Sequence, residues 1–304
     1  MNSLGFHEGE QEVQRRAGLS DEAARLEGML MPPNLDGGLT LFLAKRTLAA
    51  LTARDRAGRL WTSLVRGEPG FLEAHGSTLV VHTAPRAEDP LHEMPPGQTA
   101  GLLTIDFAIR RRVRVNGLLT RSAPDALHLE ADQAFGNCPA YIQQRSLTAD
   151  ATGGTGTVGA HQAPGLVLTA EDEKVIREAD TFFLGTTHPS RGTDTSHKGG
   201  NPGFVRIEDG TIWWPDYAGN NLFNSLGNIS ANPAAALLFI DFNTGRLIQL
   251  SGMAEIEWVT PGSPGDDGGT GRRVRFHPQQ ARTSWTPLGA DSVALSPHNP
   301  EVDA

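Results

Sequence analysis

The sequence predicts a mainly β protein with some helix (α+β), built from two copies of one domain. Three observations support this prediction. The chain has 35 glycines and 20 prolines, together 55 of 304 residues, and this composition suits short strands and turns better than helices. Short apolar segments alternate with Gly/Pro turns over most of the chain. The third and most informative observation is an internal repeat.

Four segments of the first half recur in the second half, in the same order and at offsets of 133 to 135 residues. The matching pairs are 48–52 with 182–186, 63–71 with 196–204, 102–107 with 237–242, and 116–117 with 251–252. Such a series indicates a duplicated β-rich domain of about 110 residues. Two related domains in one chain can pack as a homodimer would, so a site between the halves is expected.

The repeat and the turn signals divide the chain into five parts. These are a helical N-terminal extension (1–36), a first repeat (37–147), a linker rich in Gly and Thr (148–168), a second repeat (169–258) and a C-terminal tail (259–304). In the extension, apolar residues at helical spacing predict helix over 10–19 and 20–30, with Ser20 as an N-cap and Pro32-Pro33 as a stop.

In the first repeat, β-branched and apolar runs bounded by turns predict strands at 48–52, 60–65, 78–82, 102–107 and 113–120. A short helix is expected over 141–146, and Thr169 followed by three acidic residues opens another over 169–179. The second repeat predicts strands at 182–186, 204–207, 211–214, 236–242 and 247–258, and residues 273–276 could add one more.

Composition and charge narrow the function classes. The net charge of -9 argues against a nucleic-acid-binding surface. The single cysteine, Cys138, excludes a disulfide within the chain and any all-thiolate metal site. The longest apolar run, 234–240, is far shorter than the about 20 residues of a membrane helix, and the N-terminal MNSLGFHEGE lacks the features of a signal peptide. We therefore expect a cytoplasmic protein with no membrane, nucleic-acid or metal partner.

The segment 191–204, RGTDTSHKGGNPGF, is the strongest candidate site. Ser196 offers a hydroxyl, Lys198 a positive charge, and Gly199-Gly200 could let backbone N–H groups approach an anion. These are the groups that a phosphate dianion needs. The alternative is a hairpin loop whose glycines only make the turn.

A second polar segment, 216–228, supports the first interpretation. Its run of Asn, Ser and Gly precedes a predicted short helix, whose N-terminus would favour an anion. In the first half, alternation along a strand places Arg110, Arg112, Arg114 and Asn116 on one face. These arginines could meet the same anion, or they could protect a solvated edge strand by their charge.

Four separated motifs resemble one family. They are FHEGEQEVQRRAGL near the N-terminus, FGNCPAYIQQR at 135–145, SHKGGNPGF at 196–204, and PDYAGNNLFNSLGNISANP followed by LLFIDF. Together they are similar to the pyridoxamine 5'-phosphate oxidase-related family, and most of all to its stand-alone flavin-nucleotide-binding branch. The resemblance implies a split β-barrel, an antiparallel Greek-key fold that binds FMN at a subunit interface. Two tandem split barrels in one chain would supply both sides of that interface.

The resemblance also assigns cofactor-binding residues. It places Ser196, His197, Lys198 and Gly200 where the family contacts the flavin and its phosphate, and Asn220, Asn221, Ser225 and Asn228 in a second loop on the phosphate side. Many relatives carry a cation near this loop, whereas this chain has Asn at 221 and 224. Lys198 or an arginine of the other half, Arg112 or Arg114, must then neutralise the phosphate. Arg191, His197 or Lys198 could stabilise the reduced flavin.

We expect one FMN site per chain, dominated by the second half, because the first-half segment 63–71 keeps Ser63 and Arg66 but lacks a partner for the Asn-rich loop. The function expected is an FMN-dependent oxidoreductase acting on a small organic substrate, with NAD(P)H or F420 as electron partner and no catalytic residue assigned. The alternatives are a non-catalytic holder of flavin or haem, and a reductase that uses F420. A homodimer is compatible with each.

Overall fold

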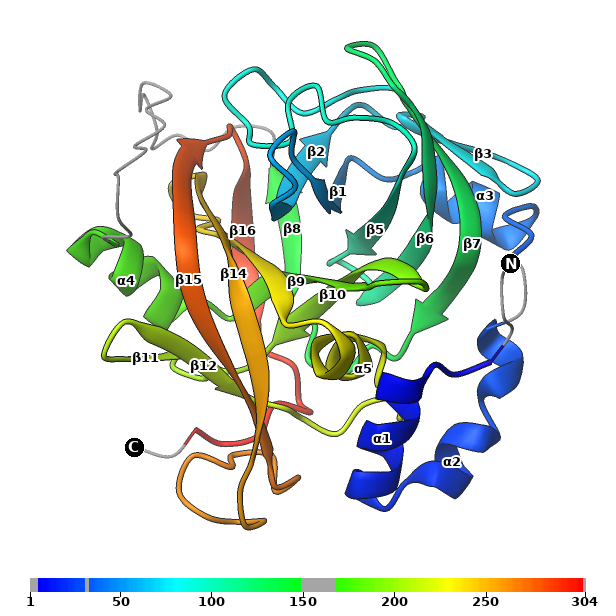
Figure 1. The fold of residues 1–304 in the computed structure, drawn as a ribbon. Coiled ribbons are helices and arrows are strands. Elements are labelled where there is room, and N and C mark those ends of the chain that lie inside the picture. The colour runs from blue at the N-terminus through cyan, green and yellow to red at the C-terminus, as the bar shows by residue number, and fades with distance from the viewer. Residues whose placement is uncertain (1–4, 31–32, 149–167, 303–304) are drawn as a thin grey trace.

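Two seven-stranded antiparallel sheets form the framework of the described chain (Figure 1). The structure is a computed structural model that describes residues 5–30, 33–148 and 168–302, so the linker expected over 148–168 lies almost entirely outside the described residues. The first sheet contains β1 (Leu48–Arg54), β2 (Leu60–Arg66), β3 (Leu72–His75), β4 (Thr78–Val81), β5 (Gln98–Asp106), β6 (Arg111–Ser122) and β7 (Leu127–Asn137). The second contains β9 (Thr181–His188), β10 (Gly192–Gly199), β11 (Arg206–Glu208), β12 (Thr211–Pro215), β13 (Ala234–Ile240), β14 (Arg246–Trp258) and β15 (Arg272–Trp285).

The two sheets have the same topology. The strand order is β2-β1-β5-β6-β7-β4-β3 in the first and β10-β9-β13-β14-β15-β12-β11 in the second, so each strand of the first half has an equivalent in the second. In the described chain the edge strands of neither sheet pair with each other, and both sheets are open. The predicted mainly β fold with tandem, split-barrel-like halves is confirmed, and the sequence repeat corresponds to a structural one.

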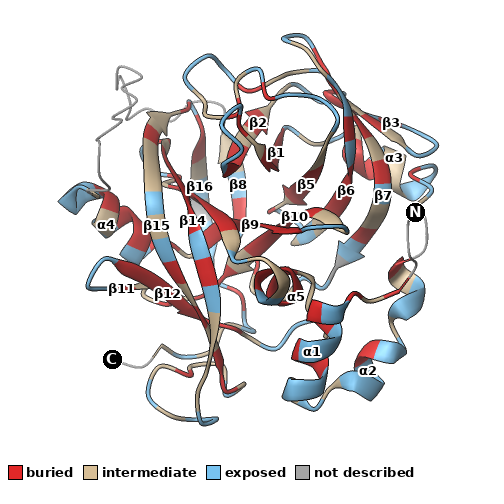
Figure 2. Ribbon diagram, viewed as in Figure 1, coloured by how far each residue is buried: buried red, intermediate tan, exposed pale blue. Residues whose placement is uncertain are grey.

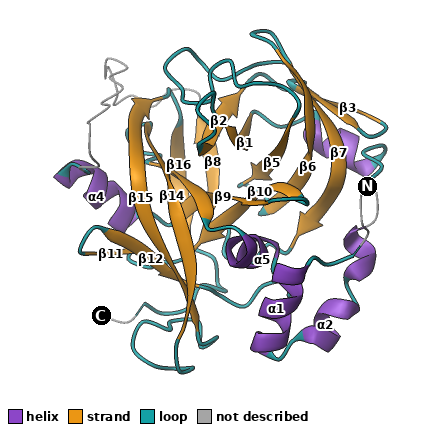
Figure 3. Cartoon of the chain, in the orientation of Figure 1, coloured by secondary structure: helices purple, strands orange, loops and turns teal. Residues whose placement is uncertain are grey.

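Helices and a small third sheet surround the two large sheets (Figure 3). The helices are α1 (Glu8–Ala17), α2 (Ser20–Ala24), the 3-10 helix η1 (Glu27–Leu30), α3 (Gly38–Leu43), α4 (Ala170–Glu178) and α5 (Asn224–Ala231). Thr169 caps α4 as expected, accepting a hydrogen bond from the backbone of Asp172. No helix in the described part of the chain is long and apolar enough to cross a membrane.

Buried apolar side chains of the described residues form three main cores. One lies inside each half, around Trp61 and Leu102 in the first and around Phe182 and Trp214 in the second. The third is shared, and it packs Phe107 of the first half against residues of the second half such as Phe242. In Figure 2 buried residues occur along the strands of both sheets, whereas most residues of α2 are exposed. The two halves therefore form one unit.

Several sequence-based expectations differ from the structure. Ser20, expected as an N-cap, is the first residue of α2, and the N-cap is Leu19, which makes no side-chain cap. The helix expected over 141–146 is wrong, because residues from Gln144 onward form strand β8 (Gln144–Thr148), which pairs with β16 (Gly289–Ala294). A partner so distant in the chain overrides local helix propensity. The segment expected as a loose tail contains the whole of β15, which pairs with both β14 and β12. The second sheet thus extends beyond Trp258.

Candidate functional site

Strands β6 and β10, one from each half, lie against each other (Figure 1). Polar side chains bridge them. Arg112 donates from Nη1 to Nδ1 of His197 (2.7 Å), and Arg114 donates from Nη2 to Oγ of Ser196 (2.6 Å). Asn116 also faces β10, where its Nδ2 donates to Oδ1 of Asp194 (2.9 Å). The expected alternation along the strand therefore holds for Arg112, Arg114 and Asn116.

Two parts of the arginine prediction need correction. Arg110 does not share this face, because it precedes β6 with a φ of 51° and donates from Nε to the carbonyl of Ile142. The alternative of a solvated edge strand is wrong, because β6 lies between β5 and β7 in the sheet.

A cavity of about 170 Å³ opens beside these strands, lined by both halves of the chain. Of the residues expected to bind a cofactor, those that line it are Arg112, Arg114, Ser196, His197, Lys198, Gly199, Asn220, Asn221 and Ser225. The residues that the sequence did not point to include Tyr141, Trp214, Asp216 and Tyr217. The Asn-rich loop and the strand carrying Ser196 thus meet in one place, as expected from the sequence.

Three of the expected residues do not line the cavity. Arg191 donates to the carbonyl of Gly5 in the N-terminal segment. Asn228 donates from Nδ2 to Oγ1 of Thr186 (3.0 Å). Gly200 donates its N–H to the carbonyl of Asp180 (3.1 Å), so the expectation that this N–H meets a phosphate is wrong.

Gly199 serves close packing. A Cβ at this position would lie 2.0 Å from the carbonyl oxygen of Tyr141, which places Tyr141 at the wall of the cavity. Gly199 therefore lets the segment after β7 come close to β10, and this position of the motif has a packing role that the phosphate interpretation did not foresee.

The cations of the cavity differ in how their charges are balanced. Arg114 forms an ion pair with Asp194 (3.0 Å), and both side chains are almost fully buried. Lys198 lies 3.5 Å from Asp216, which also pairs with Arg272 at 3.0 Å. The sequence reasoning missed both acids, although Asp194 stands two residues before Ser196 and alternation places them on one face of β10.

Arg112 is the exception. Among the described residues no carboxylate pairs with it, and its recorded partners are the ring nitrogen and the carbonyl of His197. Burial, with the positive charge of Arg114 as the second cause, lowers the pKa of Arg112 to about 10. The guanidinium is thus still cationic at neutral pH, and the cavity holds a buried positive charge without a counter-ion from the described chain.

His197 is neutral beside this arginine. Burial, and then the charge of Arg112, hold the pKa of His197 well below its usual value. Because Nδ1 accepts a hydrogen bond from Arg112, the ring proton lies on Nε2. The ring contacts Phe107 and Phe183 edge-on, with centroids 6.4 and 5.9 Å away. His197 therefore offers an N–H donor rather than a second charge.

Five residues that line the cavity carry a buried polar atom with no hydrogen-bond partner among the described residues. These atoms are Nε of Arg112, Nε of Arg114, Nε2 of His197, Nε1 of Trp214 and the hydroxyl of Tyr217. Each can donate a hydrogen bond, given the tautomer of His197. Buried donors without acceptors are rare in native proteins, and so many around one cavity call for a ligand or ordered water.

The N-terminus of α5 also faces the cavity, through Asn224 and Ser225. Its N-cap residue, Phe223, has a left-handed conformation and makes no side-chain cap. Ser225 joins the β10 network, with its Oγ 2.7 Å from Oγ of Ser196. The first turn of α5 thus adds N–H groups without a side-chain cap and the positive end of a helix dipole.

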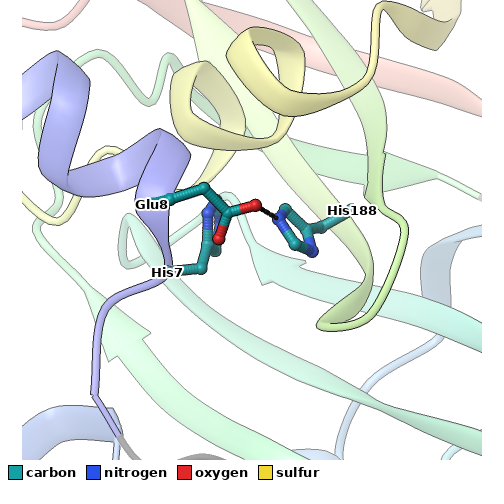
Figure 4. A group of neighbouring side chains, drawn as sticks. All are labelled: His7, Glu8 and His188. Carbon is teal, nitrogen blue, oxygen red and sulfur yellow. Dashed lines mark hydrogen bonds and ion pairs between the residues drawn. The ribbon is translucent and has the colours of Figure 1, made fainter.

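Next to the cavity, His7, Glu8 and His188 form a compact cluster (Figure 4). The imidazole rings are 4.1 Å apart, and Nε2 of His188 lies 3.0 Å from Oε1 of Glu8. The Nδ1 atoms of both rings accept backbone N–H bonds, from Gly9 (3.1 Å) and from residues that follow His188. Their Nε2 atoms therefore carry the protons, which a metal ion would have to displace.

This cluster fastens the N-terminal segment to the second half. His7 contacts Oδ1 of Asn228 on α5 through Nε2 (3.2 Å). Helix α1 then lies so close to α5 that a Cβ on Gly9 would meet the carbonyl of Gly227 at 2.2 Å. The FHEGE motif thus positions α5, and through it Ser225, beside the cavity.

Comparisons with known proteins found a family model and several similar solved structures. Residues 168–263 match the family model described as pyridoxamine 5'-phosphate oxidase. One similar solved structure is HupZ from Group A Streptococcus, with 16% identity over 41% of this chain and 99% of that one and a TM-score of 0.31. An F420 reductase is 16% identical over 36% of this chain and 94% of that one, with a TM-score of 0.28. Another is a protein related to general stress protein 26, of the pyridoxinephosphate oxidase family, from Clostridium acetobutylicum (13%, 40% and 92%, TM-score 0.29). No curated protein matches the chain.

Proposed function

The second half of this chain carries a domain of the pyridoxamine 5'-phosphate oxidase family, and from this premise we propose that the protein binds FMN in the cavity beside β6 and β10. We further propose that it acts as an FMN-dependent oxidoreductase on a small organic substrate. The observation that carries the first proposal is the buried charge of Arg112. No carboxylate of the described residues pairs with it, and other buried donors without acceptors line the same cavity.

The unpaired groups define the chemistry of the ligand. All five can donate, so they suit a ligand rich in acceptors. The net positive charge at Arg112 calls for an anion, because a buried cation without a partner is costly. FMN meets both requirements, since its phosphate is a dianion and its ring system has carbonyl oxygens and ring nitrogens as acceptors.

Separate residues would hold the phosphate and the ring. Arg112, Lys198 and the N-terminal turn of α5 are the positive groups available for the phosphate. Arg114 is already held by Asp194, so its role is to orient Ser196 across the boundary between the halves. Tyr141 and Tyr217, with ring centroids 5.1 Å apart, offer an aromatic wall.

The bound flavin would supply the redox chemistry, by accepting and donating a hydride or electrons. The protein would supply position and electrostatics. His197 stays neutral because its pKa is held so low. The hydrogen bond that Nδ1 accepts from Arg112 leaves the ring proton on Nε2, which can donate to reduced or oxidised flavin alike. NAD(P)H remains the proposed electron partner.

The test is reconstitution. Ligand-free protein is titrated with FMN and flavin fluorescence is followed, and the complex is then mixed with NADPH or NADH without oxygen. We expect saturable uptake of one FMN per chain, bleaching on reduction and recovery of the oxidised spectrum with oxygen. Failure to take up FMN would contradict the binding proposal. Uptake without bleaching by either nicotinamide would contradict the proposed electron partner, and the same titrations with haem and F420 test the two other cofactors.

A further inference from the structure

The first half of the protein contains a second cavity, of about 130 Å³, at a position equivalent to the first. Its lining includes Leu64 and Arg66 from β2, Arg86 from the loop between β4 and β5, and Leu247 and Trp285 from the second half. In the shared strand order β2 is the equivalent of β10, and β14 is the equivalent of β6. The same pairs of elements therefore border both cavities.

The hydrogen bonds confirm this equivalence. In the first cavity Ser196 receives a bond from Arg114 of the other half (2.6 Å) and lies 2.7 Å from Ser225. In the second cavity Ser63 receives a bond from Gln249 of the other half (2.9 Å) and donates to Asp89 (2.5 Å). Ser63 and Ser196 are 133 positions apart, and Arg114 and Gln249 are 135 apart, both within the offsets of the sequence repeat. Asp89 and Ser225 are 136 positions apart.

The chemistry of the second cavity differs from that of the first. Leu247 and Gln249 stand where the first cavity has Arg112 and Arg114, so this strand brings no positive charge to the second cavity. The loop between β4 and β5 contains no helix, so the positive helix end is missing as well. The cavity therefore lacks the groups proposed above to hold a dianionic phosphate.

Positive charge enters this cavity from another side, through Arg66 and Arg86. Arg66 donates from Nη1 to Oγ1 of Thr286 (3.1 Å) and to the carbonyl of Pro287 (2.8 Å), and its buried Nε has no partner among the described residues. Burial, and then the charge of Arg86, lower the pKa of Arg66. No ion pair is recorded between either arginine and an acid of the described chain.

The acids near this cavity are Glu68, Glu88 and Asp89. Asp89 is turned inward, where its carboxylate accepts hydrogen bonds from Ser63, Gln249 and the backbone of Leu91. Burial raises the pKa of Asp89. Glu88 is exposed to water at the rim, and Glu68, also exposed, acts on Arg66 from outside the lining. Asp89 is therefore held by neutral donors and not by either arginine, so both guanidinium groups are available to a carboxylate from outside the protein.

We propose that this second cavity is a separate binding site for a small aromatic carboxylate. The carboxylate would bind to the guanidinium groups of Arg66 and Arg86, and the ring would lie against the side chains of Leu64, Leu247 and Trp285. Equivalent strands border the two cavities. We attribute the different ligand to Leu247 and Gln249, which stand at the positions of Arg112 and Arg114. This proposal is independent of whether the first cavity holds FMN.

The test uses the whole protein and benzoate as the probe, with benzamide as a neutral molecule of the same shape, in isothermal titration calorimetry. Benzoate is expected to bind, and benzamide to bind about tenfold or more weakly, because the charge-assisted hydrogen bonds are lost. Arg66→Gln should lower benzoate affinity about tenfold or more by the same argument. Arg86→Gln, at an exposed position where folding is not at risk, should lower it as well.

Arg112→Gln is the matched control in the equivalent cavity, and it should leave benzoate binding unchanged. The proposal is overturned if benzoate does not bind up to about 10 mM, or if benzamide binds equally well. It is also overturned if affinity falls with Arg112→Gln and not with the substitutions at Arg66 and Arg86, because the probe would then occupy the first cavity.

Discussion

Arg114 of the first half and Asp194 of the second form an ion pair of 3.0 Å in which both side chains are almost fully buried. Asp194 also accepts hydrogen bonds from Asn116, Ser196 and Ser225, so one carboxylate gathers side chains from β6, β10 and α5. This carboxylate therefore links the two halves at the wall of the candidate site.

We predict that Asp194→Asn destabilises the protein by about 3–5 kcal/mol, because it leaves the charge of Arg114 buried and unpaired. The free energy of unfolding from urea titrations is the measurement. Asp125→Asn is a matched control, since Asp125 pairs with Arg121 on the surface and should contribute about 0–1 kcal/mol. Equal effects of the two substitutions would show that the buried pair does not stabilise the boundary.

A second prediction concerns close packing between the halves. A Cβ on Gly185 of β9 would lie 2.4 Å from both Thr52 Cγ2 and Thr62 Oγ1 of the first sheet. Gly185→Ala should therefore cost about 1–3 kcal/mol, as overpacking does in dense cores. Gly28→Ala, where nothing lies within 4 Å, is the control and should be close to neutral. Thermal unfolding of both variants measures this cost. An unchanged unfolding midpoint for Gly185→Ala would contradict the close packing of Gly185 against the first sheet.

A third prediction concerns Glu10, which lies buried in α1 and caps the helix together with His7. Burial is the main cause that raises the pKa of Glu10 from 4.5 to about 7. The folded state therefore favours the protonated form of Glu10. The stabilisation from this shifted pKa is fully present below pH 4.5 and is lost as the pH rises through 7. Burial is the main cause that lowers the pKa of His7 from 6.5 to about 4. The stabilisation from neutral His7 is therefore present above pH 6.5 and is lost as the pH falls through 4.

These two contributions oppose each other in the wild type, so the comparison is made with Glu10→Gln, in which His7 is unchanged. The stability of Glu10→Gln relative to wild type should increase by about 2–3 kcal/mol between about pH 5 and pH 8. Denaturation at several pH values measures this difference. A difference that does not change with pH would mean that Glu10 titrates normally.

The fold was predictable because the relevant signals are local or repeated. The matches at offsets of 133 to 135 identified the duplication, and the structure has the same strand order in both halves. The expectation failed for Gln144–Thr148, because the partner strand at Gly289–Ala294 lies in the other half of the chain and leaves no local trace.

The candidate site was predictable in its parts but not in its charges. Lys198 is the obvious cation of the SHKGG motif, but Asp216 partly neutralises it, and no spacing relates these two residues. Arg112 looks equal to Arg114 in sequence, and only the position of Asp194 separates the paired arginine from the unpaired one. Long-range pairing of charges depends on how the halves dock, which a single sequence does not encode at any fixed interval.

A fourth prediction follows for the unliganded protein. Because no carboxylate of the described residues balances the buried charge of Arg112, Arg112→Gln should not lower the stability of the ligand-free protein, and replacement of such a charge can even raise it. Lys198→Gln should have a small effect, since its contact with Asp216 is long and partly exposed. Loss of stability by Arg112→Gln in the absence of any ligand would mean that the protein itself balances this charge.

The central claim is that Arg112 is the charge that awaits an anionic flavin, and equilibrium FMN binding by wild type, Arg112→Gln and Lys198→Gln tests it most directly. The account predicts one FMN per wild-type chain, and an affinity that falls about 10- to 100-fold with Arg112→Gln and by less with Lys198→Gln, since only Arg112 lacks a carboxylate partner. Binding of FMN by Arg112→Gln as tightly as by wild type, or no binding by wild type, would contradict it.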